Sequence, residues 1–380
     1  MPRSMCEVVV LNDTQAFADL EAEWENLYRN APLATPFQSW AWLYSWWEYY
    51  GQGYELRLVT IRDEGLLVGL IPLILDCRRG FGRLLFVGTG PTDYQDVLAR
   101  RGWESQVSEA GIRALRQMDG WQVADLQQLR SEAAAWSIFR RWRGPCLRVW
   151  QDNCPVIDVQ PWESLVASLS KNHRSTVRRA LRRAQADGVE REFVSAEDAE
   201  KAGRRLIALH REAWQGRDII PEHQTRWFEE YMGIVALRMT ARRLGRITEF
   251  RRDGKAIISH FLFFGRSSVG EGLTGATQDA LRRYQESSLR IWDAVNVAYQ
   301  RNGQYVELLR GEEPYKLRWS SSISTNYQVI LGRHLGIWVP YSGYHLLLSR
   351  VKRYAYSEDA PQWTKKAWSK YRTLRDKLAR

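Results

Sequence analysis

A chain of 380 residues is longer than a single hydrophobic core normally supports, so we expect more than one domain. With 44% hydrophobic and 26% charged side chains, it is too apolar for a disordered protein. The net charge of +11 favours polyanionic partners, and the longest apolar runs, such as LLVGLIPLIL, are far shorter than a membrane span. No apolar stretch of signal-peptide length precedes Asp13, and the four cysteines form no C-x-x-C pair, so we expect a cytoplasmic protein without a metal site or a disulfide framework.

The first part of the chain predicts two helices and then a run of strands. Helices are expected over 14–30 and 39–50, and the second one repeats Trp42, Trp46 and Tyr50 at helical spacing. That spacing predicts a helix that faces the core rather than an exposed aromatic platform. A turn at Asp63-Glu64-Gly65 then lies among strands over 54–62, 66–75 and 83–88, which precede a helix over 103–120 and a strand over 121–129.

The second part repeats this order after a basic segment. We expect a strand over 155–159, a basic helix over 162–186 that ends at Asp187-Gly188, and helices over 195–215 and from Pro221 towards Gly233. Strand, turn, strand and strand then recur in ITEFRR, Asp253-Gly254, AIISHFLFFG and SVGEGLTGA, before a helix in SLRIWDAVNVAYQRNG and a strand in YVELLRG.

An element order that occurs twice predicts two α/β domains, each with a mixed, largely antiparallel sheet flanked by helices. We place the first domain at 1–154, the second at 155–335, and a basic helical tail at 336–380. Such a chain has room for an active site between its two halves.

Several motifs together resemble one known superfamily. They are KNHRSTVRRALRRAQADGV, LIALHREAWQGR, the hairpin strands that follow, the ending LLRGEEPYKLRW, and DYQDVL at 93–98 in the first half. Over roughly 35–320 the chain is similar to the GNAT superfamily, in particular to the acetyltransferase family linked with bacterial cellulose and exopolysaccharide biosynthesis. That family is similar in turn to the Fem-type peptidyltransferases. The resemblance implies tandem GNAT-like domains and transfer of an acyl group to an amine.

Acyl transfer to an amine requires a polarised carbonyl and a proton acceptor for the amine. The resemblance gives Lys316, in the ending R-G-x-E-x-Y-K, the role of stabilising negative charge on the donor. Tyr315 is a candidate proton donor to the leaving group, with a packed aromatic as the alternative. Candidate bases are Glu271, on the strand that would border the site, and also Asp279, Glu312 and Glu313. His260, in the middle of an apolar strand, is more typical of a core residue.

The donor is expected beside the strand SVGEGLTGA and the segment after it. Gly272 and Gly275 would permit close backbone approach, and Ser287 and Ser288 are candidates for a helix N-cap that receives phosphates. Arg282 and Arg283 would neutralise those phosphates. The glycine-rich R-x-x-G-x-G/A loop is missing, and Ser287-Ser288 replaces the Pro-Gly of many relatives.

The first half and the closing motif supply candidate acceptor-binding residues. Asp93, Tyr94 and Asp96 would recognise a cationic or hydroxyl-bearing acceptor, with turn capping as the equal alternative. Arg310 and Glu312 would contribute from the second half.

Two clusters of positive charge predict polyanion binding. One is a segment without an acidic residue and contains Lys171, Arg174, Arg178, Arg179, Arg182 and Arg183. The other is 341–380, with ten Lys/Arg and three Asp/Glu. There Trp363, Trp368 and Tyr371 alternate with basic residues, which is typical of a helix on a membrane surface or of one that packs its aromatic side back onto the protein.

The sequence therefore predicts a bacterial N-acyltransferase that uses acyl-coenzyme A and no metal. The acceptor would be a primary amine on a small molecule, an amino sugar or a peptide-like metabolite. One alternative is a Fem-like transferase that uses aminoacyl-tRNA, which the two basic clusters favour. A second alternative is a non-catalytic accessory protein of an envelope polysaccharide system.

Overall fold

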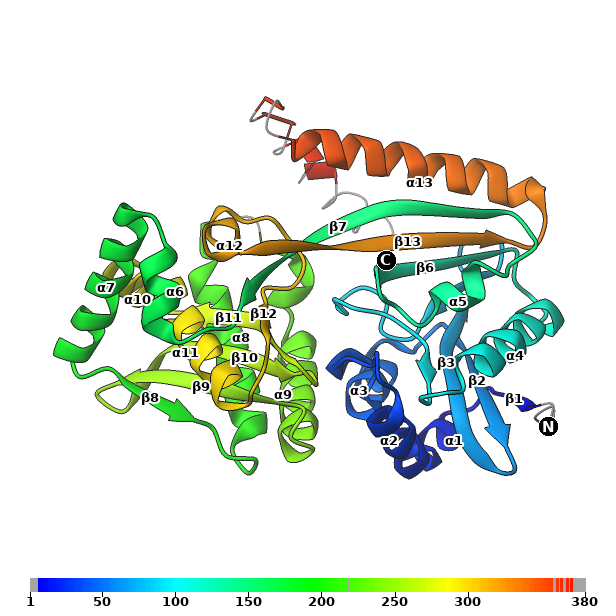
Figure 1. Cartoon of the computed structure of the whole chain (residues 1–380), viewed down its shortest axis with the longest axis horizontal. Coiled ribbons are helices and arrows are strands. Elements are labelled where there is room, and N and C mark those ends of the chain that lie inside the picture. Colours follow the sequence, from blue (N-terminus) through cyan, green and yellow to red (C-terminus); the bar gives the residue numbers. More distant parts are fainter. Residues whose placement is uncertain are drawn as a thin grey trace.

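The computed structural model describes residues 6–216, 219–357, 360–361, 363–364, 367–368 and 370–371. Within this part of the chain the two halves form two lobes, and two long strands run from one lobe to the other (Figure 1). Because of these shared strands, both lobes belong to one continuous 13-stranded sheet. The predicted α/β class with two GNAT-like halves is confirmed.

The first half has the predicted strand order. Its strands are β1 (Glu7–Leu11), β2 (Glu55–Asp63), β3 (Leu66–Asp76), β4 (Arg83–Phe86), β5 (Leu98–Ala99) and β6 (Val123–Arg130). Its helices are α1 (Thr14–Asp19), α2 (Glu21–Asn30), η1 (Pro36–Gln38), α3 (Trp40–Tyr50), α4 (Glu104–Gln117) and α5 (Trp136–Phe139). β2, β3 and β4 are antiparallel neighbours, and the connection through α4 makes β6 parallel to β4.

The second half repeats this topology. Its strands are β8 (Glu190–Phe193), β9 (Gly245–Arg252), β10 (Lys255–Phe264), β11 (Ser268–Ala276) and β12 (Tyr305–Glu307). Its helices are α6 (Trp162–Ser168), α7 (Lys171–Ala186), α8 (Ala199–Ala213), η2 (Pro221–Gln224), α9 (Arg226–Ala241), α10 (Gln278–Tyr284), α11 (Glu286–Gln300) and α12 (Pro314–Trp319). β9, β10 and β11 are antiparallel, and β12 returns parallel to β11 after α11.

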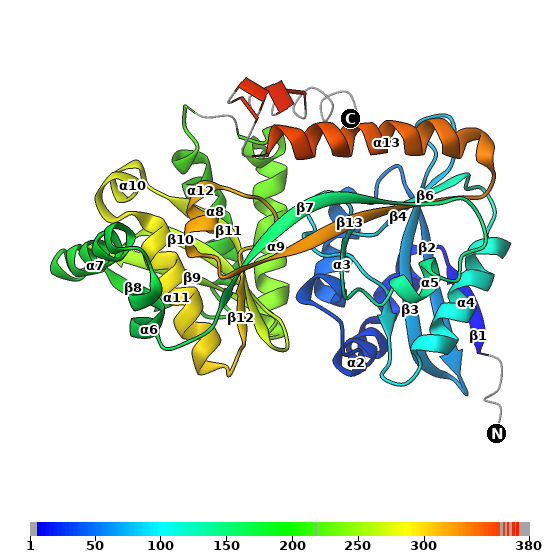
Figure 2. The same ribbon diagram turned by 45° about the horizontal axis from the view of Figure 1, so that its top comes forward.

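Two strands and a helix join the halves. β7 (Cys146–Asp158) pairs with β12 at its end and with β13 (Ser322–Gly332) along most of its length, while β13 also pairs with β6. The strand order is therefore β1-β2-β3-β4-β6-β13-β7-β12-β11-β10-β9-β8, with β5 beside β3. α13 (Leu335–Ala355) lies along the outer side of β7 and β13 (Figure 2). The predicted domain boundary at 154/155 falls inside β7, so one strand serves both lobes.

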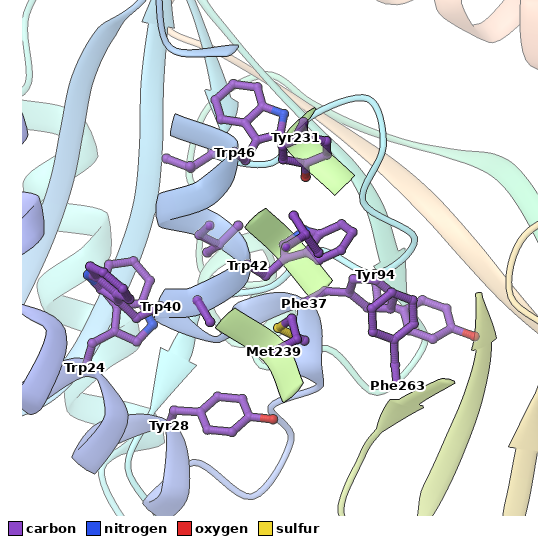
Figure 3. Close-up of a cluster of buried hydrophobic side chains, with 14 of the residues drawn as sticks. Trp24, Tyr28, Phe37, Trp40, Trp42, Trp46, Tyr94, Tyr231, Met239 and Phe263 are labelled. Carbon is purple, nitrogen blue, oxygen red and sulfur yellow. The ribbon is translucent and has the colours of Figure 1, made fainter. Parts of the chain in front are cut away.

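An aromatic core crosses from one half to the other. Trp42 and Trp46 of α3 are buried, as the helical spacing predicts, and they face Tyr231 of α9 and Phe263 of β10 (Figure 3). The Trp42 and Phe263 rings meet edge to face with centroids 5.5 Å apart. Because aromatic side chains bury large apolar areas, this cluster fixes the two lobes against each other.

The structure differs from the sequence predictions at several places. The predicted helix 14–30 is two helices, α1 and α2, and the short strands β1, β5 and β8 were not predicted. The predicted helix 162–186 is two helices, because Ser170 caps a new one by accepting a hydrogen bond from the His173 amide. The strand in YVELLRG has only three residues. β13 was not predicted at all, since its two partner strands are far away in the sequence.

The tail prediction is only partly covered. α13 is a helix, Trp368 is buried and the Tyr371 hydroxyl lies 2.6 Å from that of Tyr344, whereas 372–380 lie outside the described residues. In the described part of the chain, α13 and every other helix are too short or too polar to cross a membrane.

Candidate active site

The central feature of the second half is a pair of parallel strands that diverge. β11 and β12 pair only from Ser268 with Tyr305 to Gly270 with Glu307. Beyond that point β11 stays with β10, whereas the chain after β12 stays with β7 through hydrogen bonds from the Leu308 and Gly311 amides. In the described structure, no strand therefore pairs with 271–276 on the β12 side, and one carbonyl of this segment, that of Thr274, is bound by the His210 side chain (2.7 Å).

The corresponding place in the first half is already filled. β4 is parallel to β6 for two residue pairs, after which the loop 87–97 lies beside β6, where the Gln95 amide donates to the Gln128 carbonyl (2.9 Å). The Trp42 indole also binds Thr92 of this loop (2.8 Å). The repeated topology thus leaves one open strand edge, in the second half, and directs the tip of a first-half loop towards it.

An ion pair joins that loop to the closing motif. The Arg310 guanidinium donates to the Asp93 carboxylate (2.8 Å) and to the Gly90 carbonyl (3.1 Å). The side-chain amide of Asn326, on β13, donates a hydrogen bond to the backbone carbonyl of Asp93 (2.8 Å). Asp93 and Arg310, both predicted to bind the acceptor, are therefore brought together where the halves meet, and each is the other's partner.

Lys316 lies next to this ion pair. It is on α12 and only 7% exposed, and its ammonium donates to the Arg310 carbonyl (2.6 Å) and to the Glu313 carboxylate (3.0 Å). The turn is tight because Gly311 has φ of 112° and its Cα faces the Glu313 carboxylate. An ammonium has three N–H donors, so this arrangement uses two of them.

The other residues of the motif pack behind Lys316. Tyr315 is half-buried, and the Arg290 guanidinium carbon lies over its ring, 5.5 Å from the ring centroid. Trp319 is buried against His173, with ring centroids 4.6 Å apart. The motif therefore forms a short helix on an aromatic base, which orients Lys316 towards the Arg310 turn.

The predicted bases differ in their partners. Glu271 is buried and ion-paired with Arg290, Asp279 pairs with Arg252 (3.3 Å), and Glu313 pairs with Lys316. The Glu312 carboxylate accepts a hydrogen bond from the Asn153 side chain (3.0 Å), and no cation among the described residues pairs with it. Glu312 therefore differs from the other three candidates, because its partner is a neutral amide and theirs are cations.

Glu271 belongs to a buried polar network below the strand edge. Arg290 of α11 binds both Glu271 and Glu286, the latter at 3.3 Å. His260 binds Asp293 (3.0 Å), and burial lowers the pKa of this histidine. His260 is thus a core residue with a partner, as its apolar strand predicts, and the network connects β10 and β11 to α11.

The glycines and serines predicted to bind the donor have other contacts in the structure than expected. The close approach that Gly272 and Gly275 permit is to this protein's own elements, because added Cβ atoms would lie 2.4 Å from Phe263 and from the His210 amide. Ser287 and Ser288 do not cap α11; its N-cap is Gln285, with φ of 50°. This corrects the predicted cap, and the turn before α11 is made by Gln285 in the left-handed region.

The predicted phosphate-binding arginines also differ from each other. Arg283 already binds Asp187 through two hydrogen bonds (2.5 and 2.8 Å), whereas Arg282 is exposed. Together with the first amides of α11, Arg282 is the feature here that best fits a pyrophosphate.

The basic cluster lies on α7. The helix buries Val177, Ala180 and Ala184 and packs against α10 and α11. Of the six predicted cations, Arg174 is half-buried. The other five are exposed: Lys171, Arg178, Arg179, Arg182 and Arg183. The basic face therefore lies beside the helices that follow the open strand.

Two first-half predictions have a structural explanation. The Asp96 carboxylate accepts hydrogen bonds from the amides of Val97, Ala134 and Ala135 at 2.7 to 2.9 Å, and burial raises its pKa to about 6. This is the turn-capping alternative rather than contact with an acceptor. Tyr94 is buried between Glu307 and Cys154, and burial raises the pKa of its phenol.

A histidine pair beside β11 was missed by the sequence analysis. His210 Nδ1 donates to the Thr274 carbonyl (2.7 Å), and His210 Nε2 lies 3.1 Å from His223 Nδ1. Since His210 uses its proton on Thr274, His223 must donate to it. No sequence motif marks the pair, because a helix and a loop bring the two residues together across twelve intervening positions.

The pair predicts a pH dependence of stability. Burial, with His210 and Arg211 nearby, lowers the pKa of His223 to about 3. The folded protein therefore binds fewer protons than the unfolded chain below about pH 6.5, and the free energy of unfolding falls as the pH drops. We expect His223→Gln to lose less stability than the wild type between pH 7.5 and 5 in urea unfolding. His334→Gln, an exposed control, should follow the wild type; a parallel fall in all three proteins would contradict this.

Two pockets in the described part of the structure lie away from the strand edge. The larger, about 640 Å³, lies between α2 and the end of α9, with Glu25, Tyr28 and Arg242 in its wall. In the described part of the chain, no group of three or more His, Cys, Asp or Glu side chains is arranged to hold a metal ion.

The chain was compared with known proteins. Residues 171–317, which contain α7, the diverging strands and Lys316, match the model of the acetyltransferase (GNAT) domain. The chain carries a GNAT domain. No curated protein matches it in sequence.

Solved structures agree with this GNAT fold. FemX has a TM-score of 0.60 at 10% identity, with 85% of this chain and 96% of FemX covered. The C-terminal domain of a putative lysylphosphatidylglycerol synthetase from Agrobacterium fabrum has a TM-score of 0.54 at 12% identity, covering 87% and 97%. L-PGS from Bacillus licheniformis has 0.54 at 9%, covering 87% and 95%. The protein is a GNAT-fold acyltransferase in which two GNAT-like halves share one sheet.

Proposed function

We propose that this protein transfers an acyl group from acyl-coenzyme A to a primary amine, at the place where β11 and β12 diverge. The observation that carries the proposal is the edge of β11 at 271–276, which has no strand partner on the β12 side and is followed by α10 and α11. Arg290 of α11 connects this strand to the closing motif, because it binds Glu271 and lies over Tyr315, the neighbour of Lys316. An extended pantetheine arm would bind this edge, and its phosphates would meet Arg282 and the first amides of α11.

The reaction follows from the groups at this site. The amine nitrogen attacks the thioester carbon, and the third N–H of Lys316 binds the oxyanion that forms. Glu312 takes the amine proton, the C–N bond forms and the C–S bond breaks. Tyr315 supplies a proton to the departing thiolate, and Asp93 with Arg310 orients the acceptor from the first half.

Removing the base should slow the reaction without changing the fold. Glu312→Gln keeps the hydrogen bond to Asn153 and removes the proton acceptor, so we expect turnover to fall about 100-fold. Glu271→Gln is the matched comparison, because Glu271 is paired with Arg290, and its turnover should fall less. A larger loss in Glu271→Gln than in Glu312→Gln would move the role of base to Glu271.

A second candidate donor is aminoacyl-tRNA. The exposed basic face of α7 favours it, because five cations along one helix suit a long polyanion better than a single pyrophosphate. The strand edge and Lys316 would then hold the aminoacyl ester in place of the thioester.

A paired titration distinguishes these donors. The purified protein is titrated with acetyl-coenzyme A and with charged and uncharged tRNA at near-physiological salt. Micromolar binding of the thioester, without preference for charged tRNA, supports the coenzyme A donor. Preference for charged over uncharged tRNA would replace it with the second candidate, and binding of neither would leave the accessory-protein function.

A further inference from the structure

α13 presents its polar side to the protein. The Tyr341 hydroxyl donates to the Asp125 carboxylate (2.6 Å), the Ser349 hydroxyl to the Trp150 carbonyl (2.6 Å), and Lys352 binds β7 through a backbone carbonyl. These residues follow one another at intervals of about two turns or one turn and therefore share the face that lies on the sheet. The helix is attached through these hydrogen bonds and through Trp338 and Tyr341, which pack on a small buried cluster in the sheet.

The opposite side of α13 is apolar and exposed. Its exposed fractions run from 38% for Ile337 to 64% for Leu335, with Leu347 at 60%. We call this side the outer face of α13; it consists of Leu335, Ile337, Val339, Leu347, Val351 and Tyr354.

The number of large apolar side chains exposed on this side is unusual for a helix on a soluble domain. A surface helix normally turns its apolar stripe to the core and its polar side chains to water. Figures 1 and 2 both show α13 on the outside of the long strands, away from the two lobes. A contiguous apolar surface of this kind marks a contact with a partner or a membrane.

The positive charge around α13 favours an anionic membrane over a second copy of this chain. From 332 to 357 the chain has Arg333, Arg350, Lys352 and Arg353 and no acidic residue, and Arg350 and Arg353 are exposed. A second copy of this chain, with a net charge of +11, would be repelled from this surface. An anionic lipid surface would attract it, since basic side chains beside an apolar helix face bind lipid phosphates.

We infer that the outer face of α13 docks the protein on an anionic membrane surface. Its aliphatic side chains enter the headgroup region, and Arg350 and Arg353 bind lipid phosphates. This role does not depend on the transferase reaction. Apart from Leu335, α13 lies within the predicted tail 336–380, but the apolar contact is on this helix and not on the segment with Trp363, Trp368 and Tyr371.

Vesicle flotation of the full chain tests the inference. The wild type is mixed with phosphatidylcholine vesicles containing 30% phosphatidylglycerol, and separately with pure phosphatidylcholine vesicles. We expect binding to the anionic vesicles only, with part of it retained at high salt because the apolar contact is not screened. Leu347→Glu/Val351→Glu should reduce the bound fraction at least tenfold.

The control variant introduces the same change in charge at positions away from α13. Val9→Glu/Leu66→Glu introduces the same two charges at exposed first-half positions and should bind as the wild type does. Circular dichroism confirms that each variant is folded. An equal loss in both double variants, or no wild-type binding to anionic vesicles, would overturn the inference. So would a wild-type dimer in light scattering that Leu347→Glu/Val351→Glu converts to a monomer.

Discussion

Replacing Lys316 by methionine should lower turnover 100- to 1000-fold, because the variant keeps the buried stem and loses the ammonium that, in the proposed reaction, binds the oxyanion of the donor. A single donor to a developing oxyanion contributes roughly 3–4 kcal/mol to the transition state. The loss should appear in kcat, with little change in the KM for the amine. Lys255→Met, at an exposed lysine at the start of β10, should turn over as the wild type does.

A separate variant distinguishes catalysis from support of the turn. Lys316 also binds the Arg310 carbonyl and Glu313, so its removal changes the local structure as well. Glu313→Gln removes the ion pair and keeps the ammonium, and we expect its turnover to fall less than tenfold. If Glu313→Gln and Lys316→Met lose equal activity, Lys316 supports the turn and has no direct part in the reaction.

Replacing Arg290 by methionine should reduce the free energy of unfolding by roughly 3–5 kcal/mol, which is typical when one partner of a buried ion pair is removed. Glu271 would then be buried without its cation, since both side chains are almost fully inaccessible. Urea unfolding measures the effect. Arg282→Met, at a nearby exposed arginine, should change stability by no more than about 0.5 kcal/mol.

The double variant provides the sharper result. Glu271→Gln/Arg290→Met removes both charges, so it should be more stable than Arg290→Met alone. Additive losses in the two single variants would show that Glu271 and Arg290 do not depend on each other, and the network below the strand edge would need another explanation.

The repeated fold was predictable because its signals are local. Turn residues such as Asp253 and Gly254, and alternating strand residues, occur twice in the same order. β13 was not predictable in this way, since both of its neighbours, β6 and β7, precede it by more than 150 positions. The exposed apolar side of α13 also escaped prediction, because a helical apolar stripe normally indicates the buried face.

The candidate site residues follow from sequence motifs, whereas their contacts depend on the three-dimensional packing. Lys316 came from the closing motif, and the structure places it in contact with the Arg310 turn. That Arg310 binds Asp93, more than 200 positions away, depends on how the two halves meet. The partners of Glu271 and Glu312, which separate the candidate bases, follow from the same three-dimensional packing.

Amide hydrogen exchange with and without acetyl-coenzyme A tests the central claim most directly, because it reports where the donor binds. The structure predicts slower exchange at 271–276 and in the first turn of α11, and no change at β4, the corresponding strand of the first half. Slower exchange at β4 instead, or unchanged exchange at 271–276 with saturating donor, would contradict a donor site between the diverging strands.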